Sequence, residues 1–166
     1  MTAWLLVVGL IDADAAKLSF EIEDEEGRLL PCRIHLFDQD EKPQRAAGLP
    51  FWRDHFVCPG AAGLELPAGR YRYEIERGPE HERLTGEVAI SDQSPKLVRL
   101  SLKRIANLRR EGWYSADLHI HRPLSQVDLL MQAEDLDFAP VITWWNRRDH
   151  WEPHRHPQAG EDEREG

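Results

Sequence analysis

Three side chains that can bind metal alternate with apolar residues in the stretch Ser115 to His121. They are Asp117, His119 and His121. Because successive side chains of a β-strand point to opposite faces, this spacing places one carboxylate and two imidazoles on one side of a predicted strand. Two imidazoles at this spacing can bind one metal ion or bridge two. We therefore predict a metal site at His119 and His121; the alternative is a half-exposed strand that only carries histidines.

A helix is predicted directly after this strand. Ser125 to Asp128 has the form of a capping box, which predicts a helix from Ser125 through about Asp135. Its apolar face is short and is shared by Val127, Leu130, Met131 and Glu134. We expect helices to cover the apolar side of the preceding strand.

A second strand is predicted after the helix, which completes a strand–helix–strand unit. The run from Phe138 to Trp145 is almost continuously apolar, as in a strand buried on both faces of a parallel sheet. Sites in such sheets form at the carboxyl ends of the strands. His119 and His121 should therefore face the same cleft as the stretch Trp144 to Asn146.

The stretch Gly112 to Arg122 resembles the opening of a polymerase-and-histidinol-phosphatase (PHP) domain, in its carbaryl-hydrolase-like (CehA/McbA) branch. The resemblance implies a distorted barrel of alternating strands and helices, two or three divalent metal ions, and hydrolysis of phosphoesters or other esters. The Asp-Leu-His-x-His motif implies that His119 and His121 are metal ligands and that Asp117 is the catalytic acid beside them. Trp144 and Trp145 stand where the family's second motif has Asp-His.

The resemblance also implies what this chain lacks. A barrel of this type needs upwards of ~200 residues, and only about fifty follow Gly112. We therefore expect the N-terminal portion of a metal-dependent hydrolase that is not a competent catalyst alone and needs the remainder of the barrel or a partner chain. The implied cofactor is a divalent zinc, manganese or iron ion, and the implied partner is a small-molecule substrate.

Composition indicates a folded protein without a nucleic-acid or membrane footprint. Apolar residues make up 41% of the chain and charged residues 31%, as in globular domains. The net charge of −9 argues against binding to nucleic acid or to an anionic membrane surface. No stretch has the eighteen or so apolar residues that a membrane span requires.

Residues 1–15 have features of a secretory signal peptide. Ala3 to Ile11 is a short apolar run, and Ala13 to Ala15 forms an Ala-x-Ala pattern before Ala16. The prediction is a periplasmic or extracellular protein. The alternative is a buried first strand, because the run lacks a preceding basic residue and is followed by Asp12.

Residues 16–103 are predicted to form a small antiparallel β-sandwich. Five segments alternate between apolar and other residues and are separated by Gly- and Pro-containing turns. Their apolar residues are Leu18, Phe20 and Ile22 in the first segment; Cys32, Ile34 and Leu36 in the second; Tyr71, Tyr73 and Ile75 in the third; Leu84, Val88 and Ile90 in the fourth; and Val98, Leu100 and Leu102 in the fifth. Leu64 to Tyr71 resembles an edge of transthyretin-like, carboxypeptidase-regulatory modules. The predicted fold class is thus mainly β, a sandwich followed by the first βαβ unit of a truncated α/β barrel of the PHP type.

Other residues of the sandwich are assigned no chemistry. Cys32 and Cys58 would form a disulfide in an exported protein or remain buried thiols in the cytosol. The aromatic stretch Phe51 to Phe56 is predicted to close one end of the sandwich rather than to bind a partner. His35 and His81 have no spaced partner and receive no function.

The remaining segments are predicted to be a linker and a tail. Residues 104–112 are a basic connector, residues 113–146 begin the barrel, and residues 147–166 form a polar, histidine-rich tail. The tail carries His150, His154 and His156, which can bind metal adventitiously.

The sequence therefore leaves three functional hypotheses. The first is an exported metal-dependent hydrolase of the PHP type. The second is a non-catalytic cell-surface binding module with a degenerate barrel, which the pair Trp144 and Trp145 favours. The third is an ordinary amidohydrolase, which also has His-x-His after its first strand.

Overall fold

The computed structural model describes residues 15–91, 95–141, 144–145 and 148–149. Residues 1–14, with the predicted signal peptide, and the histidine-rich tail from 150 onward lie outside this range. The described elements, in chain order, are β1 (Ala16–Glu23), β2 (Cys32–Phe37), β3 (Phe51–Trp52), β4 (His55–Cys58), β5 (Ala61–Leu66), β6 (Gly69–Glu76), β7 (Leu84–Ile90), β8 (Lys96–Ser101), the 3₁₀-helix η1 (Leu108–Glu111), α1 (Leu124–Glu134), β9 (Trp144–Trp145) and β10 (Arg148–Asp149). None of the described helices is long and apolar enough to span a bilayer.

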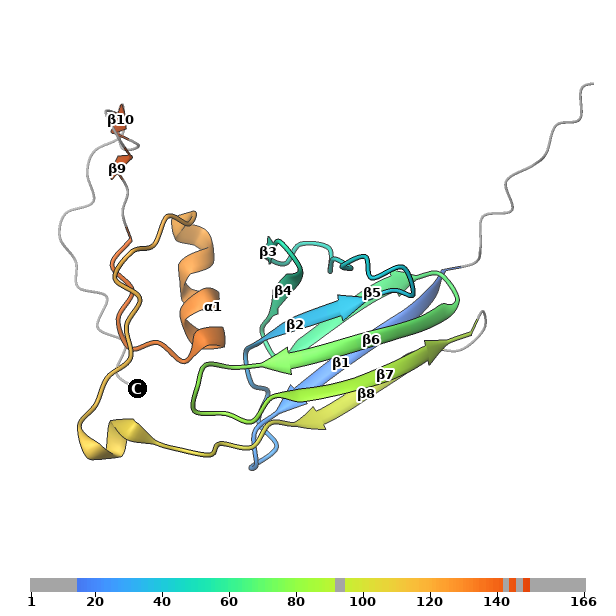
Figure 1. Ribbon diagram of the computed structural model, residues 1–166, viewed down its shortest axis with the longest axis horizontal. Helices are drawn as coiled ribbons and strands as arrows, with labels where there is room; N and C mark the ends of the chain where they lie inside the picture. Colours follow the sequence, from blue (N-terminus) through green and yellow to red (C-terminus); the bar gives the residue numbers. More distant parts are fainter. Residues whose placement is uncertain (1–14, 92–94, 142–143, 146–147, 150–166) are drawn as a thin grey trace, which may run out of the picture.

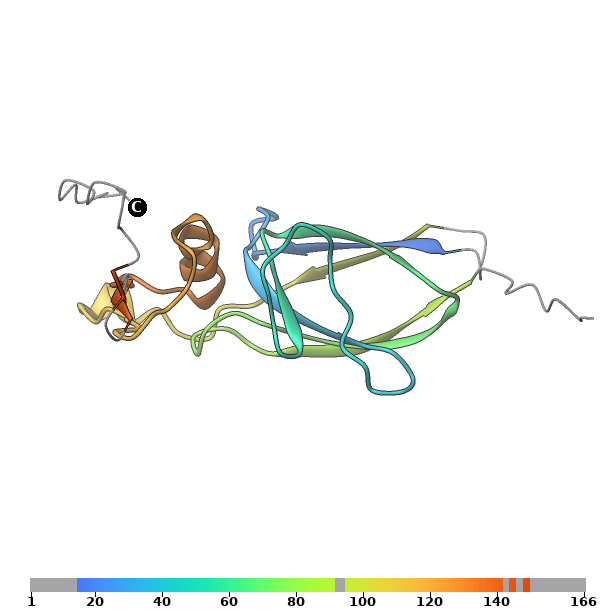
Figure 2. The same ribbon diagram turned by 90° about the horizontal axis from the view of Figure 1, so that it is seen from above.

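Two sheets face each other and enclose the core (Figures 1 and 2). One sheet has the strand order β5-β1-β8 and the other has the order β3-β4-β2-β6-β7. All pairings within them are antiparallel except that of β1 with β8, which is parallel. The mainly β fold predicted for this region is confirmed.

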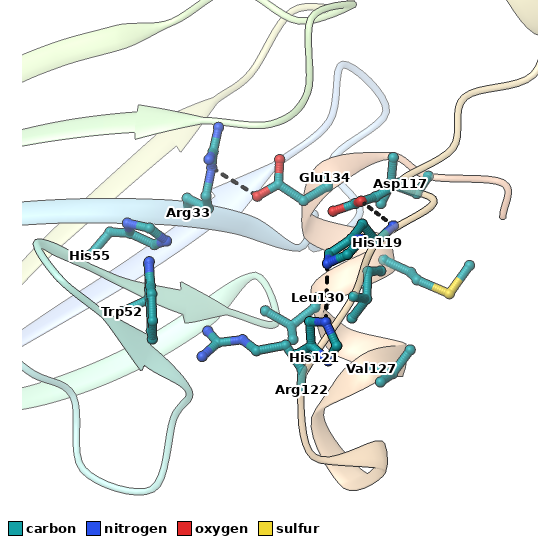
Figure 3. A pocket seen from close by; sticks show the side chains of 13 residues that line it. Arg33, Trp52, His55, Asp117, His119, His121, Arg122, Val127, Leu130 and Glu134 are labelled. Carbon is teal, nitrogen blue, oxygen red and sulfur yellow. Dashed lines mark hydrogen bonds and ion pairs between the residues drawn. The ribbon is translucent and has the colours of Figure 1, made fainter. Parts of the chain in front are cut away.

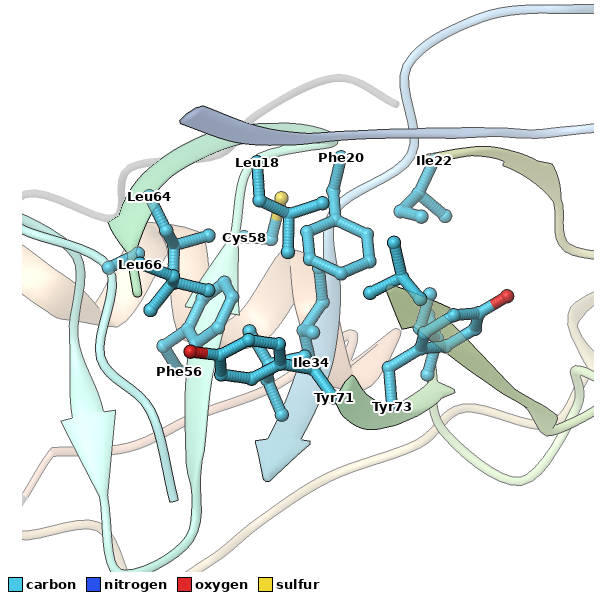
Figure 4. Packing of buried hydrophobic residues seen from close by; sticks show 14 of the residues in the cluster. Leu18, Phe20, Ile22, Ile34, Phe56, Cys58, Leu64, Leu66, Tyr71 and Tyr73 are labelled. Atoms are coloured by element: carbon cyan, nitrogen blue, oxygen red, sulfur yellow. The ribbon is translucent and has the colours of Figure 1, made fainter. Parts of the chain in front are cut away.

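The core consists of the inward-facing residue of every second position in the strands, as the period-two patterns predicted. In β1 the residues Leu18, Phe20 and Ile22 are at most 1% exposed. The Phe20 ring packs edge-on against Tyr73 of the opposite sheet, with ring centroids 5.8 Å apart. Figure 4 shows these side chains filling the space between the two sheets. This core supports the five-stranded sheet, whose outer face forms one wall of the candidate site.

Cys32 and Cys58 lie directly opposite each other in the antiparallel pair β2–β4. Both are buried free thiols. A hydrogen bond to the Cys58 thiol, together with burial, raises the pKa of Cys32 well above its usual value. Opposed positions on neighbouring strands have Cα separations within the range that a disulfide accepts. Of the two alternatives that the sequence left open, the structure shows the thiol pair.

Helix α1 is present, but the predicted capping box is not. The helix begins at Leu124 with Pro123 at the N-cap, and no side chain caps it. Pro123 is extended, with φ −54° and ψ 130°, and its ring sets the turn into the helix without needing an N–H donor. Ser125 therefore lies inside the first turn. The helix ends at Glu134, and Asp135 takes the left-handed conformation that terminates many helices.

The two predicted strands of the C-terminal unit appear only as isolated parallel bridges. Ala116 pairs with Phe138, and Ile120 pairs with Val141. The structure does not show the predicted strand from Phe138 to Trp145 buried on both faces: Phe138 is 57% exposed, and Trp144–Trp145 pair in antiparallel fashion with Arg148–Asp149. Ile142 and Thr143, between these two pieces, lie outside the described residues.

A cluster of buried charges attaches α1 to the sandwich. Asp135 accepts hydrogen bonds from Arg77 Nη2 at 2.8 Å and from Arg104 Nη2 at 2.6 Å. Arg77 also donates to the carbonyl oxygens of Pro31 (2.7 Å) and Gln132. Burial raises the pKa of Asp135, but Arg77 and Arg104 outweigh it and hold the pKa below its usual value. The linker residue Arg104 is thus a structural ion-pair partner.

Gly78 allows the sandwich to approach the end of α1 closely. Its φ is +49°, and a Cβ there would lie 2.5 Å from the carbonyl oxygen of Glu134. Gly27 has a comparable φ of +79° with no atom within 4 Å of its Cβ position. We expect Gly78→Ala to cost about 2 kcal/mol more than Gly27→Ala, because both add backbone strain but only the first adds a clash. Urea unfolding of the two variants measures the difference, and equal midpoints would contradict the close approach.

Candidate functional site

A pocket of about 550 Å³ lies between the outer face of the five-stranded sheet and the C-terminal unit. Figure 3 shows Arg33, Trp52 and His55 on the sandwich side, facing His119 and His121. Apolar side chains of α1, namely Val127, Leu130 and Met131, complete the lining together with Glu134, Asp117, Ile120, Arg122 and Leu136. The face of α1 identified from its sequence pattern therefore faces this pocket.

His119 and His121 come together as their spacing predicted. Their Nε2 atoms lie 3.1 Å apart, and their ring centroids are 4.8 Å apart. Two nitrogens at Zn–N distances of about 2.0–2.1 Å in a tetrahedral site are roughly 3.3 Å apart. The two imidazoles therefore already have the separation that one shared metal ion requires. Their role as metal ligands stays a prediction.

Asp117 shapes the backbone between the two histidines. Its Oδ1 accepts a hydrogen bond from the backbone N–H of His119 at 3.0 Å. This side-chain-to-backbone bond spans two residues, as in an Asx-turn. This contact orients the segment that carries His119. Its catalytic role stays a prediction.

The apolar side of this segment is not covered as predicted. Leu118 is 73% exposed. The reason is that α1 lies on the side of the histidines, where its residues line the pocket. Among the described residues, no element covers the side to which Leu118 points. Phe138 and Tyr114, which contact each other, are also more than half exposed.

Glu134 is a pocket carboxylate to which the sequence analysis gave no chemical role. It lies in the last turn of α1, with its Oε1 atom 3.0 Å from Arg33 Nε. Burial, aided by the nearby carboxylates of Glu76 and Asp117, raises the pKa of Glu134 although Arg33 opposes this shift. The sequence pattern could have identified Glu134 as a pocket residue, because Glu134 lies on the same helical face as the apolar residues of α1.

The aromatic stretch of β3 and β4 divides between core and pocket. Phe56 is fully buried, and Phe51 packs against the core, so both help to close the sandwich as predicted. Trp52, in contrast, is 51% exposed and lines the pocket. The Arg122 guanidinium lies 4.9 Å from the Trp52 ring centroid, within the range of a cation–π contact. Trp52 therefore belongs to the pocket wall.

Two further groups of residues could hold a metal ion. They are His35 with Asp54 and His55, and His35 with Glu74 and Glu76. Both lie on the sandwich, where the sequence analysis gave His35 no function. These groups were missed because they depend on how the strands pair. His35 lies directly opposite His55 in one neighbouring strand and opposite Glu74 in the other.

Several titratable side chains lie close to His35. A hydrogen bond to His55 lowers the pKa of Asp54. Burial lowers the pKa of His55, which favours its neutral form. Burial raises the pKa of Glu76, but Arg33, His35 and Arg83 outweigh it and lower that pKa. His81, the other histidine without an assigned function, is buried near Asp135, and burial lowers its pKa.

Comparisons with known proteins give no family. No family model matches the chain, and no curated protein matches it. Solved structures with partial similarity include a streptococcal ancillary pilin (16% identity, TM-score 0.41, covering 56% of this chain and 33% of that one). Another is the major pilin subunit of Bacillus cereus, with 14% identity and a TM-score of 0.36, covering 54% of this chain and 29% of that one. A third is phospholipase PlaB from Legionella pneumophila, with 11% identity and a TM-score of 0.32, covering 55% of this chain and 25% of that one. The match thus spans a third or less of each of these chains, and similarities this low support no functional argument.

Proposed function

We propose that the pocket binds a divalent metal ion through His119 and His121 and serves the hydrolysis of small-molecule esters or phosphoesters. The observation that carries this proposal is the 3.1 Å separation of the two Nε2 atoms at the wall of a pocket. The resemblance of the Asp-Leu-His-x-His motif to the carbaryl-hydrolase-like branch of the PHP superfamily supports the same chemistry.

The residues around the histidines have roles that fit hydrolysis. A zinc, manganese or iron ion would polarise a substrate oxygen and lower the pKa of a bound water. Asp117 would hold the backbone of His119 in place through its hydrogen bond to that residue's N–H. Glu134, whose pKa burial raises, is suited to hold a proton at its carboxyl group and pass it to a leaving oxygen. Trp52 and Arg122 form a wall against which a substrate can pack.

The connections of the C-terminal unit support the start of a parallel barrel. The bridges Ala116–Phe138 and Ile120–Val141 are both parallel, and α1 forms the crossover between them. Tyr114 and Phe138 contact each other and are exposed. Leu118 is exposed as well, and further barrel elements or a partner chain would cover such apolar side chains. We further propose an exported location, periplasmic or extracellular, on the basis of the signal-like pattern in residues 1–15.

The second candidate function is a non-catalytic binding module. The observation that favours it is Trp52, which is half-exposed beside the guanidinium groups of Arg53 and Arg122. Clustered Trp and Arg side chains are common at binding hot spots. This function would need no metal-bound water.

Cobalt(II) substitution tests the hydrolase against the binding module. A metal ion held by few protein ligands keeps a water whose pKa falls near 7. In a background that carries His35→Gln, His55→Gln and alanine at His150, His154 and His156, so that other histidines do not contribute, we therefore expect the visible spectrum of the cobalt-loaded chain to change with an ionisation at about pH 7. The change should be lost in the double variant His119→Ala/His121→Ala. A spectrum without this ionisation, or one that persists in the double variant, would contradict the proposed function.

A further inference from the structure

The outer face of the five-stranded sheet carries a second cluster of metal-binding side chains. Residues Cys32, Ile34 and Leu36 of β2 point into the core, so alternation directs His35 outward. His35 is the direct partner of His55 in β4. Both histidines therefore stand on neighbouring strands of the sheet, which is the support that a precise site needs, and Asp54 lies in the turn directly before β4.

Asp54 bridges the two histidine rings. Its Oδ1 atom lies 3.0 Å from His55 Nδ1, and its Oδ2 atom lies 3.5 Å from His35 Nδ1. One candidate ligand atom from each of the three residues lies within 4.8 Å of the others. The imidazole side chains are only 13% and 14% exposed, whereas Asp54 is 51% exposed. The carboxylate is thus the most exposed of the three side chains.

Glu76 orients His35 within the cluster. Its Oε1 atom lies 3.1 Å from His35 Nε2, so that nitrogen carries the ring proton. A neutral His35 then turns the lone pair of Nδ1 toward the Asp54 carboxylate. These two acceptors repel each other unless a cation or a second proton lies between them. A histidine that donates its other N–H to a carboxylate is also the usual arrangement around a protein-bound metal.

The other possible group, His35 with Glu74 and Glu76, is less suited to a cation. Glu76 already pairs with Arg33 Nη2 at 2.9 Å and with Arg83 Nη2 at 3.0 Å. Arg83 also lies 3.3 Å from Glu74. Two guanidinium groups therefore occupy the positions that a metal ion would need, and they leave the Asp54 side of His35 as the favoured position.

We propose that His35, Asp54 and His55 form a second metal site, which binds a divalent transition-metal ion independently of His119 and His121. Two imidazoles and one carboxylate match zinc with an open fourth position. Nickel and cobalt share this preference for imidazole ligands. The His55 side of this cluster lines the same pocket that His119 and His121 face. The proposal does not depend on the hydrolytic function.

Zinc titration by calorimetry tests this site by itself. All proteins in the test carry His119→Ala and His121→Ala, and alanine at His150, His154 and His156, so that other histidines do not contribute. We expect this background to bind zinc. Adding His35→Gln and His55→Gln should weaken zinc binding at least about 100-fold, because both imidazole ligands are lost.

A second variant keeps the test decisive if the glutamine variant folds poorly. Asp54→Asn changes a half-exposed residue and should weaken zinc binding about 10-fold or more while the thermal transition stays unchanged. Zinc affinity that is the same with and without these substitutions, or a folded background that does not bind zinc, would overturn the proposal.

Discussion

Asp135→Asn is expected to destabilise the chain by about 3 kcal/mol at neutral pH, because it leaves the Arg77 guanidinium buried without its charge partner. The Arg77 side chain is only 10% exposed, and that of Asp135 is 16% exposed. Asparagine tolerates the left-handed conformation of residue 135, where φ is 57°. The substitution therefore removes the charge without adding backbone strain. Urea unfolding monitored by circular dichroism measures the change.

The same substitution should alter the pH dependence of stability. The pKa of Asp135 is lowered in the folded chain. The contribution of this carboxylate to the free energy of unfolding is therefore fully present above the pKa of about 3.9 that an aspartate has in the unfolded chain. That contribution is lost as the pH falls through the lower folded pKa. Asp135→Asn should lack this acid-sensitive component.

Asp40→Asn is the matched control for Asp135→Asn. Asp40 pairs with Lys42 at 3.3 Å, but both side chains are more than 70% exposed, so its loss should cost less than about 1 kcal/mol. Equal losses of stability in the two variants would mean that the Arg77–Asp135–Arg104 cluster does not hold α1 on the sandwich.

His119→Ala and His121→Ala are each expected to weaken zinc binding at the pocket at least about 100-fold, because each removes one of two ligands that are already paired. The titration is made on chains that carry His35→Gln and His55→Gln and alanine at the three tail histidines. Isothermal titration calorimetry gives both affinity and stoichiometry.

Leu118→Ala provides the control on the same segment. Leu118 lies between the two histidines but is 73% exposed, so its truncation should leave zinc affinity within a factor of about two, as expected for exposed positions. If the histidine variants bind zinc as tightly as the Leu118 variant does, the pocket does not use these imidazoles.

Much of the sandwich core could be predicted from sequence because the strands that supply most of it follow a local period of two. Leu18, Phe20 and Ile22 alternate with polar neighbours, and the structure buries all three. The strands β3, β4 and β5 were missed. In β4, Phe56, Val57 and Cys58 are all buried, so no alternation was visible. Val57 is buried on the outer side of the sheet, where α1 contacts β4.

The candidate site could be predicted only where its parts are close in sequence. Asp117, His119 and His121 were recognised because strand alternation alone groups them. The group of His35, Asp54 and His55 depends on the pairing of β2 with β4, which no local pattern reveals. The Pro123 cap was missed for a different reason, because the Ser125–Asp128 pattern is a valid capping box that the preceding proline overrides.

Bound-metal content of the chain purified without added metal is the measurement that tests the central claim most directly. Elemental analysis compares the unaltered protein with His119→Ala/His121→Ala. Our account predicts zinc, manganese or iron in the unaltered protein and a loss of about one ion per chain in the double variant. The same metal content in both proteins, or no metal in either, would contradict a metal centre at His119 and His121.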